Sequence, residues 1–181
     1  MQDSAPRPSE TLEYWPVTLR RWRWRDEEAA YTAVIESMDH LRPWMPWALA
    51  YTRENAGGFL AACEQDWNSG VAYNYAITVG GQIAGSCGLM ARIGPGGLEI
   101  GYWVHQAYVR RGLATASAAA LTDAAFRLPG IDHVEIVHDE LNEASAAVPR
   151  KLGFTELGSR SLDIRPEAGT GTGIVWRLTR P

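Results

Sequence analysis

The sequence predicts a single α/β (α+β) domain with one mixed, mostly antiparallel, splayed sheet flanked by about four helices. Three observations predict it. Short alternating apolar stretches recur between glycine and proline turns, amphipathic stretches separate some of them, and no repeat or linker divides the chain. A chain of 181 residues with 46% hydrophobic content can bury one core. We expect residues 1–11 to be a flexible tail and residues 12–181 to be the domain.

The first half of the chain is predicted to begin with a strand and two helices. Asp26 can cap the first helix, and Glu27 and Glu28 favour its N-terminus through the helix dipole. Pro43 and Pro46 predict an irregular, stiff aromatic loop, because each removes an N–H group and restricts the preceding residue. The expected elements are a strand over 17–24, a helix over 26–38, the loop over 40–47, a helix over 53–67, and strands over 72–79 and 82–92 joined by a Gly80–Gly81 hairpin turn.

The second half is predicted to alternate strands and helices. Its first strand carries Glu99 among apolar residues, and Leu128-Pro129-Gly130 ends the helix that follows. A glycine-rich stretch near the C-terminus predicts a closing hairpin. The expected elements are the Glu99 strand, a helix over 112–128, a strand over 133–137, a helix over 143–152, and strands over 155–164 and 173–178.

The turn between the Glu99 strand and the next helix has the features of an anion site. Arg110, Arg111 and Gly112 lie where backbone N–H groups at a helix N-terminus have no intrahelical partner, and the helix dipole adds positive potential there. The turn therefore predicts a seat for phosphate or pyrophosphate. The residues expected to form it are Val109, Arg110, Arg111, Gly112, Leu113, Ala114 and Thr115.

Two segments in this order resemble the GNAT superfamily of acetyl-CoA-dependent N-acetyltransferases, and within it the Rim-type enzymes that acetylate protein N-termini. The pyrophosphate motif of the family is Gln/Arg-x-x-Gly-x-Gly/Ala. Arg111, Gly112 and Ala114 match it, while Val109 stands where Gln or Arg is usual and keeps the backbone N–H. Asn142-Glu143-Ala144-Ser145 and Leu152-Gly153-Phe154 resemble the Rim-type Asn-x-x-Ser and Leu-Gly-Phe segments. The resemblance covers roughly residues 12–180.

The resemblance implies roles for individual residues. Glu99 is the expected general base and Ser145 the expected proton donor, because the helix tyrosine that many members use is replaced by Pro149. Acetyl-CoA is expected to enter between the Glu99 and His133 strands. A strand bulge near Gly101 would offer backbone N–H groups to the thioester oxygen. Cofactor contacts are also expected from Trp103, Val104 and, along the pantetheine arm, Asn142.

Both catalytic residues have simpler explanations. Glu99 could be an exposed strand residue or the partner in a structural ion pair. Ser145 could serve only as a small residue that lets the helix approach the cofactor closely. Pro149 leaves the Ser145 carbonyl without its usual helical donor and is expected to bend the helix.

The acceptor is predicted to be a primary amine, with a protein or peptide N-terminus as the leading candidate. Deprotonating an α-amine at pH 7 costs about 1 kcal/mol, whereas a lysine side chain costs about 4 to 5 kcal/mol, so a single carboxylate suits the α-amine. Arg42 and Arg53 outnumber Glu54 in the expected acceptor loop and favour an acceptor with acidic groups. The alternatives are a small-molecule amine (polyamine, amino acid or antibiotic) and a non-catalytic acetyl-CoA sensor. The loop residues expected to line the acceptor site are Trp44, Met45 and Trp47.

Composition bounds the other function classes. The net charge of −4 argues against nucleic acid, so Trp22 and Trp24 within RRWRWR are read as core residues of an amphipathic strand rather than base-stacking platforms. The sequence shows no membrane-spanning run and no signal segment. Two cysteines in apolar surroundings favour a reducing cytoplasm, and a homodimer is left open. No metal is expected, because the four histidines lack ligand spacing: His40, His105, His133 and His138.

Overall fold

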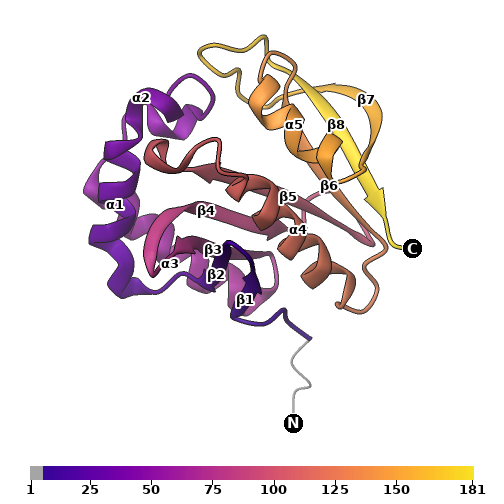
Figure 1. Ribbon diagram of the computed structural model, residues 1–181, viewed down its shortest axis with the longest axis horizontal. Coiled ribbons are helices and arrows are strands. Elements are labelled where there is room, and N and C mark those ends of the chain that lie inside the picture. The colour runs from indigo at the N-terminus through magenta and orange to yellow at the C-terminus, as the bar shows by residue number, and fades with distance from the viewer. Residues whose placement is uncertain (1–5) are drawn as a thin grey trace.

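Eight strands form one mixed sheet in the order β1-β2-β3-β4-β5-β6-β8-β7 in the computed structural model, which describes residues 6–181 (Figure 1). The strands are β1 (Thr11–Tyr14), β2 (Val17–Arg21), β3 (Ala72–Val79), β4 (Gln82–Met90), β5 (Gly97–Val104), β6 (His133–Asp139), β7 (Thr155–Ser161) and β8 (Thr172–Thr179). The α-helices are α1 (Glu27–Glu36), α2 (Met38–Leu41), α3 (Arg53–Ser69), α4 (Leu113–Phe126) and α5 (Glu143–Lys151). Short 3-10 turns lie at Trp24–Asp26, Pro46–Ala48 and Gln106–Tyr108.

The sheet is antiparallel except between β5 and β6, which run parallel. Their pairing begins at Gly97 with His133 and ends at Ile100 with Ile136, although both strands continue beyond that point. The sheet therefore splays open between the last residues of β5 and β6. This is the place where the family resemblance implies that the cofactor enters. The predicted mixed, splayed sheet is confirmed.

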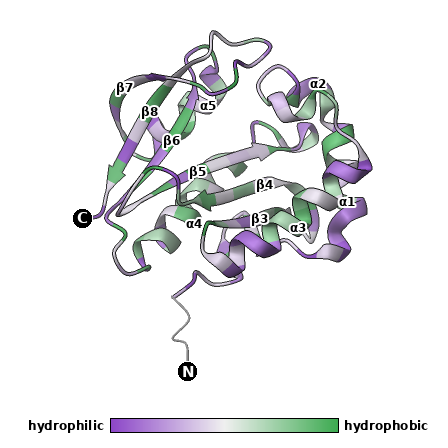
Figure 2. Cartoon of the chain, turned by 180° about the vertical axis from the view of Figure 1, so that it is seen from behind, coloured by the Kyte–Doolittle hydropathy of each residue, from purple (hydrophilic) through white to green (hydrophobic). Residues whose placement is uncertain are grey.

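Helices cover both faces of the sheet. Helices α1 and α3 lie on one face of the sheet, and α4 and α5 lie on the other. Figure 2, which shows the chain from behind, places hydrophilic residues on α1. Side chains alternate along β5, so Leu98 and Ile100 enter the main core under α4 while Glu99 lies on the α1 side. The two faces of β5 therefore differ at the splay: one face packs into the core, and the other carries the charged Glu99.

Several predicted elements agree closely with the structure. Strand β3 has the expected bounds, and its hairpin to β4 turns at Gly80 and Gly81 with φ values of 55° and 80°, as a two-residue primed turn requires. Helix α3 begins after Thr52, whose side chain accepts the N–H of Asn55. Strands β7 and β8 form the closing hairpin, with β8 between β6 and β7 in the sheet.

The N-terminal segment differs from the expectation. Residues 1–5 of the expected tail lie outside the described residues, but from residue 6 onward the chain is held in place. Tyr75 donates a hydrogen bond to the Ser9 carbonyl (2.8 Å), Arg7 donates to the Asn68 carbonyl, and Thr11 starts β1, a strand that was not predicted. The polar sequence concealed β1, because its side chains are mostly exposed and only its backbone pairs with β2.

Four further expectations need correction. The strand expected over 17–24 ends at Arg21, so Trp22 is buried but Trp24 lies on a 3-10 turn and is 79% exposed. The helix expected over 26–38 is divided at Ser37, and the loop expected over 40–47 includes the end of α2 and the start of a 3-10 turn. Asp26 does not cap its helix, because its carboxylate binds Arg20.

Candidate active site

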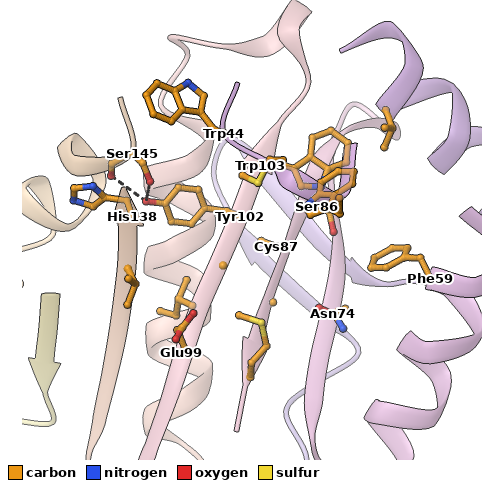
Figure 3. A pocket seen from close by; sticks show the side chains of 18 of the residues that line it. Trp44, Phe59, Asn74, Ser86, Cys87, Glu99, Tyr102, Trp103, His138 and Ser145 are labelled. Carbon is orange, nitrogen blue, oxygen red and sulfur yellow. Dashed lines mark hydrogen bonds between the residues drawn. The ribbon is translucent and has the colours of Figure 1, made fainter. Parts of the chain in front are cut away.

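A cavity of about 980 Å³ opens at the splay of the sheet. Glu99 and Trp103 line it from one face of β5, and Tyr102 reaches toward α5, where Ser145 and the loop before the helix form the opposite wall (Figure 3). Asn142 lines the same wall. The structure thus brings together the predicted base, the predicted proton donor and the predicted acceptor loop around one space.

The predicted phosphate seat lies directly after β5, at the N-terminus of α4. The first helical hydrogen bond joins the N–H of Ala116 to the Gly112 carbonyl (3.0 Å). Within residues 6–181, no acceptor takes the backbone N–H groups of residues 109–115. Seven successive donors at the positive end of a 14-residue helix have the arrangement that favours an anion.

The backbone conformation of the seat explains its sequence. Gly112 (φ 76°) and Arg110 (φ 61°) both adopt the left-handed region, and such residues alternating with ordinary ones turn successive N–H groups toward one point. Arg110 and Arg111 have no carboxylate partner within the part of the chain that the structure describes, although the Arg111 guanidinium stacks on the Tyr108 ring at 5.2 Å. Their charge is therefore available to an anion.

Glu99 is 4% exposed and carries two ion pairs. One carboxylate oxygen binds Arg92 and the other binds Arg160 at 3.0 Å. The guanidinium-bearing side chains are 60% and 48% exposed, so they reach the buried carboxylate from the surface. Glu99 is therefore an ion-pair partner, as one of the simpler explanations expected, and its carboxylate also lines the cavity.

Ser145 lies in the first turns of α5 and is half-buried. Its Oγ is 3.1 Å from the hydroxyl of Tyr102, and the same hydroxyl lies 3.1 Å from the Ser145 carbonyl oxygen. Burial raises the pKa of Tyr102 to about 12, although the Ser145 contact partly opposes the rise. The family resemblance implied only that the backbone near Gly101 and Tyr102 faces the thioester and did not identify the Tyr102 hydroxyl, whose only signal was its position three residues after Glu99.

His138 lines the cavity beside this pair but holds no free ring nitrogen (Figure 3). The indole N–H of Trp176 donates to His138 Nε2 (2.9 Å), so Nε2 is the acceptor and Nδ1–H donates to the Asp139 carbonyl (2.8 Å). His138 is therefore fixed as the neutral Nδ1–H tautomer and holds the wall in place.

The wall before α5 is fastened by two side chains. Asn142 caps the helix by accepting the N–H of Ser145 at 3.1 Å. The buried Asp139 accepts the N–H groups of Leu141, Thr170 and Gly171. Burial raises the pKa of Asp139, but these three hydrogen bonds outweigh it and place the pKa below its usual value.

The predicted acceptor residues Trp44, Met45 and Trp47 all line the cavity. Trp47 is 45% exposed and packs against Tyr51 and Trp103, with ring centroids 5.7 and 6.2 Å apart. Met45 also covers a small core cluster under α1 and α2. All three residues are cavity walls, and Met45 also packs against the core.

The arginines of the acceptor loop do not supply the expected free charge. Arg53 pairs with Glu28, and Arg42 lies 3.9 Å from Glu167. The preference for an acidic acceptor, which rested on Arg42 and Arg53, is therefore not supported.

The structure bears on three expectations about β5 and α5. The Trp103 ring packs against Trp47, and the Val104 side chain packs against the main core, so a cofactor contact from Val104 would have to come from its backbone. The bulge expected near Gly101 is absent, since β4 and β5 pair in continuous register from Gly85 with Val104 to Met90 with Glu99; register shifts lie in the β3–β4 and β7–β8 pairs. Helix α5 continues through Pro149, in keeping with the helix expected over 143–152.

The structure bears on the other function classes. Glu10 pairs with Arg21 and Arg23, and Asp26 pairs with Arg20, which removes the positive surface that a nucleic-acid platform at Trp24 would need. Among residues 6–181, no group of three metal-ligating side chains occurs. No helix in the described residues has the length and apolar character of a membrane span.

Comparisons with known proteins agree with this geometry. The Acetyltransferase (GNAT) domain family matches residues 17–155. A protein of Bacillus subtilis (strain 168) named "Putative ribosomal N-acetyltransferase YdaF" is 28% identical over 147 residues, covering 78% of this chain and 79% of that protein.

Solved structures share the fold. RimL, a ribosomal L7/L12 alpha-N-protein acetyltransferase in complex with coenzyme A, has a TM-score of 0.86 at 21% identity, covering 94% of this chain and 98% of that one. Mycobacterium smegmatis RimJ, in complex with CoA-disulfide, has a TM-score of 0.81 at 23% identity, covering 93% and 85%. The chain belongs to the GNAT acetyltransferase family, and acetyl-CoA, the donor that this family uses, is its cofactor.

Proposed function

We propose that this chain transfers the acetyl group of acetyl-CoA directly to the α-amine of a protein N-terminus, in the manner of a ribosomal-protein acetyltransferase. One arrangement carries the proposal: the free N–H groups of residues 109–115 precede α4, which packs on β5, and β5 places a buried carboxylate, Glu99, in a cavity that the Ser145 side of α5 also lines. The relative from Bacillus subtilis and the RimL and RimJ structures bear names of this class.

Each residue has a defined task in the proposal. Backbone N–H groups of Val109, Arg110, Arg111, Gly112, Leu113, Ala114 and Thr115 hold the pyrophosphate. Trp103, Asn142 and the backbone of Val104 border the pantetheine path. The amine lies against the aromatic wall of Trp44, Met45 and Trp47.

Glu99 accepts the proton of the amine, directly or through water, after the exposed side chains of Arg92 and Arg160 give way to the incoming ammonium group. Because an α-amine needs only about 1 kcal/mol to lose its proton at pH 7, a carboxylate with two cationic neighbours suffices.

Replacing Glu99 with glutamine tests the assignment, with Glu135→Gln as the matched control. Glu135 is the register partner of Glu99, is 5% exposed, and is ion-paired to Arg177, but it does not line the cavity. Glu99→Gln is expected to lower the rate of thiol release with N-terminal peptides by about a hundredfold while coenzyme A affinity stays unchanged. Glu135→Gln is expected to keep the rate.

The acceptor panel decides the finer point. The wild-type chain is assayed with N-terminal peptides, lysine side chains, polyamines, amino acids and aminoglycosides. Faster turnover of a small amine than of any peptide would contradict the protein N-terminus, and coenzyme A binding without thiol release from any amine would identify a sensor.

A further inference from the structure

The phenol of Tyr102 contacts Ser145 at the splay of the sheet, and it enters from the face opposite Glu99. Along β5, Tyr102 follows Leu98 and Ile100 on the side of α4 and α5. The cavity reaches both faces because β5 and β6 have separated by this point. Figure 3 shows the Tyr102 ring directed at Ser145 and away from Glu99. A donor and an acceptor of protons thus lie on opposite sides of one space.

The Ser145 carbonyl is available to Tyr102 because of Pro149. In an α-helix this carbonyl would accept the N–H of the residue four positions later, and proline has none. The Tyr102 hydroxyl takes the vacant place at 3.1 Å and is held equally close to Ser145 Oγ. Pro149 stands where many family members have a helix tyrosine. Because it lacks an N–H group, it also leaves the Ser145 carbonyl free to bind a tyrosine of the sheet, Tyr102.

We propose that Tyr102 is a positioning residue that supplies the proton which Ser145 passes to the departing thiolate; this inference rests on the acetyl transfer proposed above. The amine nitrogen forms the C–N bond, the C–S bond breaks, and its electron pair goes to sulfur. The Tyr102 O–H, which donates to the Ser145 carbonyl at rest, turns its proton toward Ser145 Oγ, which lies at the same distance of 3.1 Å. The Ser145 Oγ proton then moves to sulfur while the Tyr102 phenol proton moves to Ser145 Oγ. The phenolate regains a proton from water after the products leave, and the proton of the amine goes to Glu99.

The chemistry favours this pair over Ser145 alone. Ser145 acting alone would be left as an alkoxide, and an aliphatic alcohol is a weaker acid than the Tyr102 phenol, even with the phenol pKa raised by burial to about 12. Burial keeps the phenol of Tyr102 protonated throughout the neutral range. His138, the other ionisable side chain beside the pair, has both nitrogens engaged and supplies no proton.

The test compares two acetyl donors that differ in the leaving atom. Selenols are much stronger acids than thiols, so the selenium analogue of acetyl-CoA keeps the nucleotide tail but releases a selenolate that needs no proton. With acetyl-CoA and an N-terminal peptide, Tyr102→Phe is expected to lower kcat about a hundredfold with KM for acetyl-CoA unchanged. With the selenium analogue, Tyr102→Phe and wild type are expected to agree within about threefold.

Tyr75→Phe is the matched control, since Tyr75 is buried, donates to a backbone carbonyl (Ser9, 2.8 Å) and does not line the cavity. It is expected to keep kcat with both donors. The double variant Tyr102→Phe/Ser145→Ala is expected to lose no more than Ser145→Ala alone, because the two groups act in series.

An equal loss with the sulfur and selenium donors would overturn the inference, because a structural role does not depend on the leaving atom. Unchanged kcat in Tyr102→Phe would overturn it as well. Both results require a wild-type chain that acetylates the peptide; if wild type transfers no acetyl group from either donor, the proposed function itself has failed.

Discussion

The two ends of the proposed site are built from different parts of the chain. The proposed cofactor end is backbone: seven successive N–H groups at residues 109–115, on one turn and one helix. The acceptor end consists of side chains that come together from distant segments, among them Trp47, Tyr51 and Trp103. A site made of local backbone leaves a compact motif in the sequence, whereas a site made of distant side chains leaves none.

Charge separates the two ends as well. Arg110 and Arg111 have no carboxylate partner among residues 6–181, but the arginines near the acceptor end are all engaged. Arg42 and Arg53 face Glu167 and Glu28, while Glu99 takes Arg92 and Arg160. The cofactor end therefore attracts anions, and the acceptor end is close to neutral. Four substitutions test this contrast.

The largest effect is expected at Thr115, in the first turn of α4. Thr115→Glu places a negative charge among the N–H donors, where it stabilises the helix N-terminus but repels a pyrophosphate by about 2 kcal/mol, or about thirtyfold in Kd. Calorimetry with coenzyme A measures the loss, and Thr115→Gln is the neutral control. Equal affinities of the two variants for coenzyme A would contradict the assignment of the pyrophosphate to this turn.

Asp139→Asn tests the wall beside α5, which depends on long-range contacts. Folding lowers the pKa of Asp139, so its ionised form contributes stability that is fully present above the ordinary carboxyl pKa of about 3.8 and is lost as pH falls through the folded pKa. We expect the variant to be about 1 to 2 kcal/mol less stable at pH 7, with the difference shrinking below about pH 4. Urea unfolding at both pH values measures it, and a difference independent of pH would contradict the charge assignment.

Trp47→Ala tests the acceptor end, and Trp24→Ala is its control. Trp47 is 45% exposed inside the cavity wall, whereas Trp24 is 79% exposed outside it. Removing the Trp47 ring is expected to raise KM for the peptide about tenfold, through about 1.4 kcal/mol of lost apolar contact, and to leave coenzyme A affinity unchanged. A matching loss in coenzyme A affinity would mean that the two ends are not separate.

The smallest effect is expected from Arg110→Gly. Glycine keeps the N–H group and relieves the positive φ of 61°, but removes one charge. We expect about a threefold weaker affinity for coenzyme A, measured by calorimetry, with a slightly higher Tm. A loss greater than about thirtyfold would show that side-chain charge, and not backbone, holds the phosphate.

The sequence predicted most of the elements that position the site, for local reasons. Gly80 and Gly81 specify their hairpin, and Thr52 specifies the start of α3. The failures were segments whose structure depends on distant partners. Strand β1 has no apolar pattern of its own, and Trp24 was assigned to the core by analogy with Trp22.

The same division holds for the functional residues. The sequence singled out Glu99 and Ser145 as candidates, but the arginines on Glu99 come from the segment after β4 and from β7, 7 and 61 residues away. Tyr102 and Ser145 are 43 residues apart, and no sequence pattern near either residue predicts their contact. Motif spacing reports which residues are near one another along the chain, not which surfaces meet.

By itself, the sequence determined the fold, the run of N–H donors before α4 and the orphaned carbonyl of Ser145, because turns, helix ends and a missing proline N–H are local properties of the backbone. The tertiary structure alone decided what occupies that carbonyl, what neutralises Glu99 and which aromatic rings form the acceptor wall. Those outcomes depend on where β5 and β6 part, and only the packing of the whole sheet fixes that point.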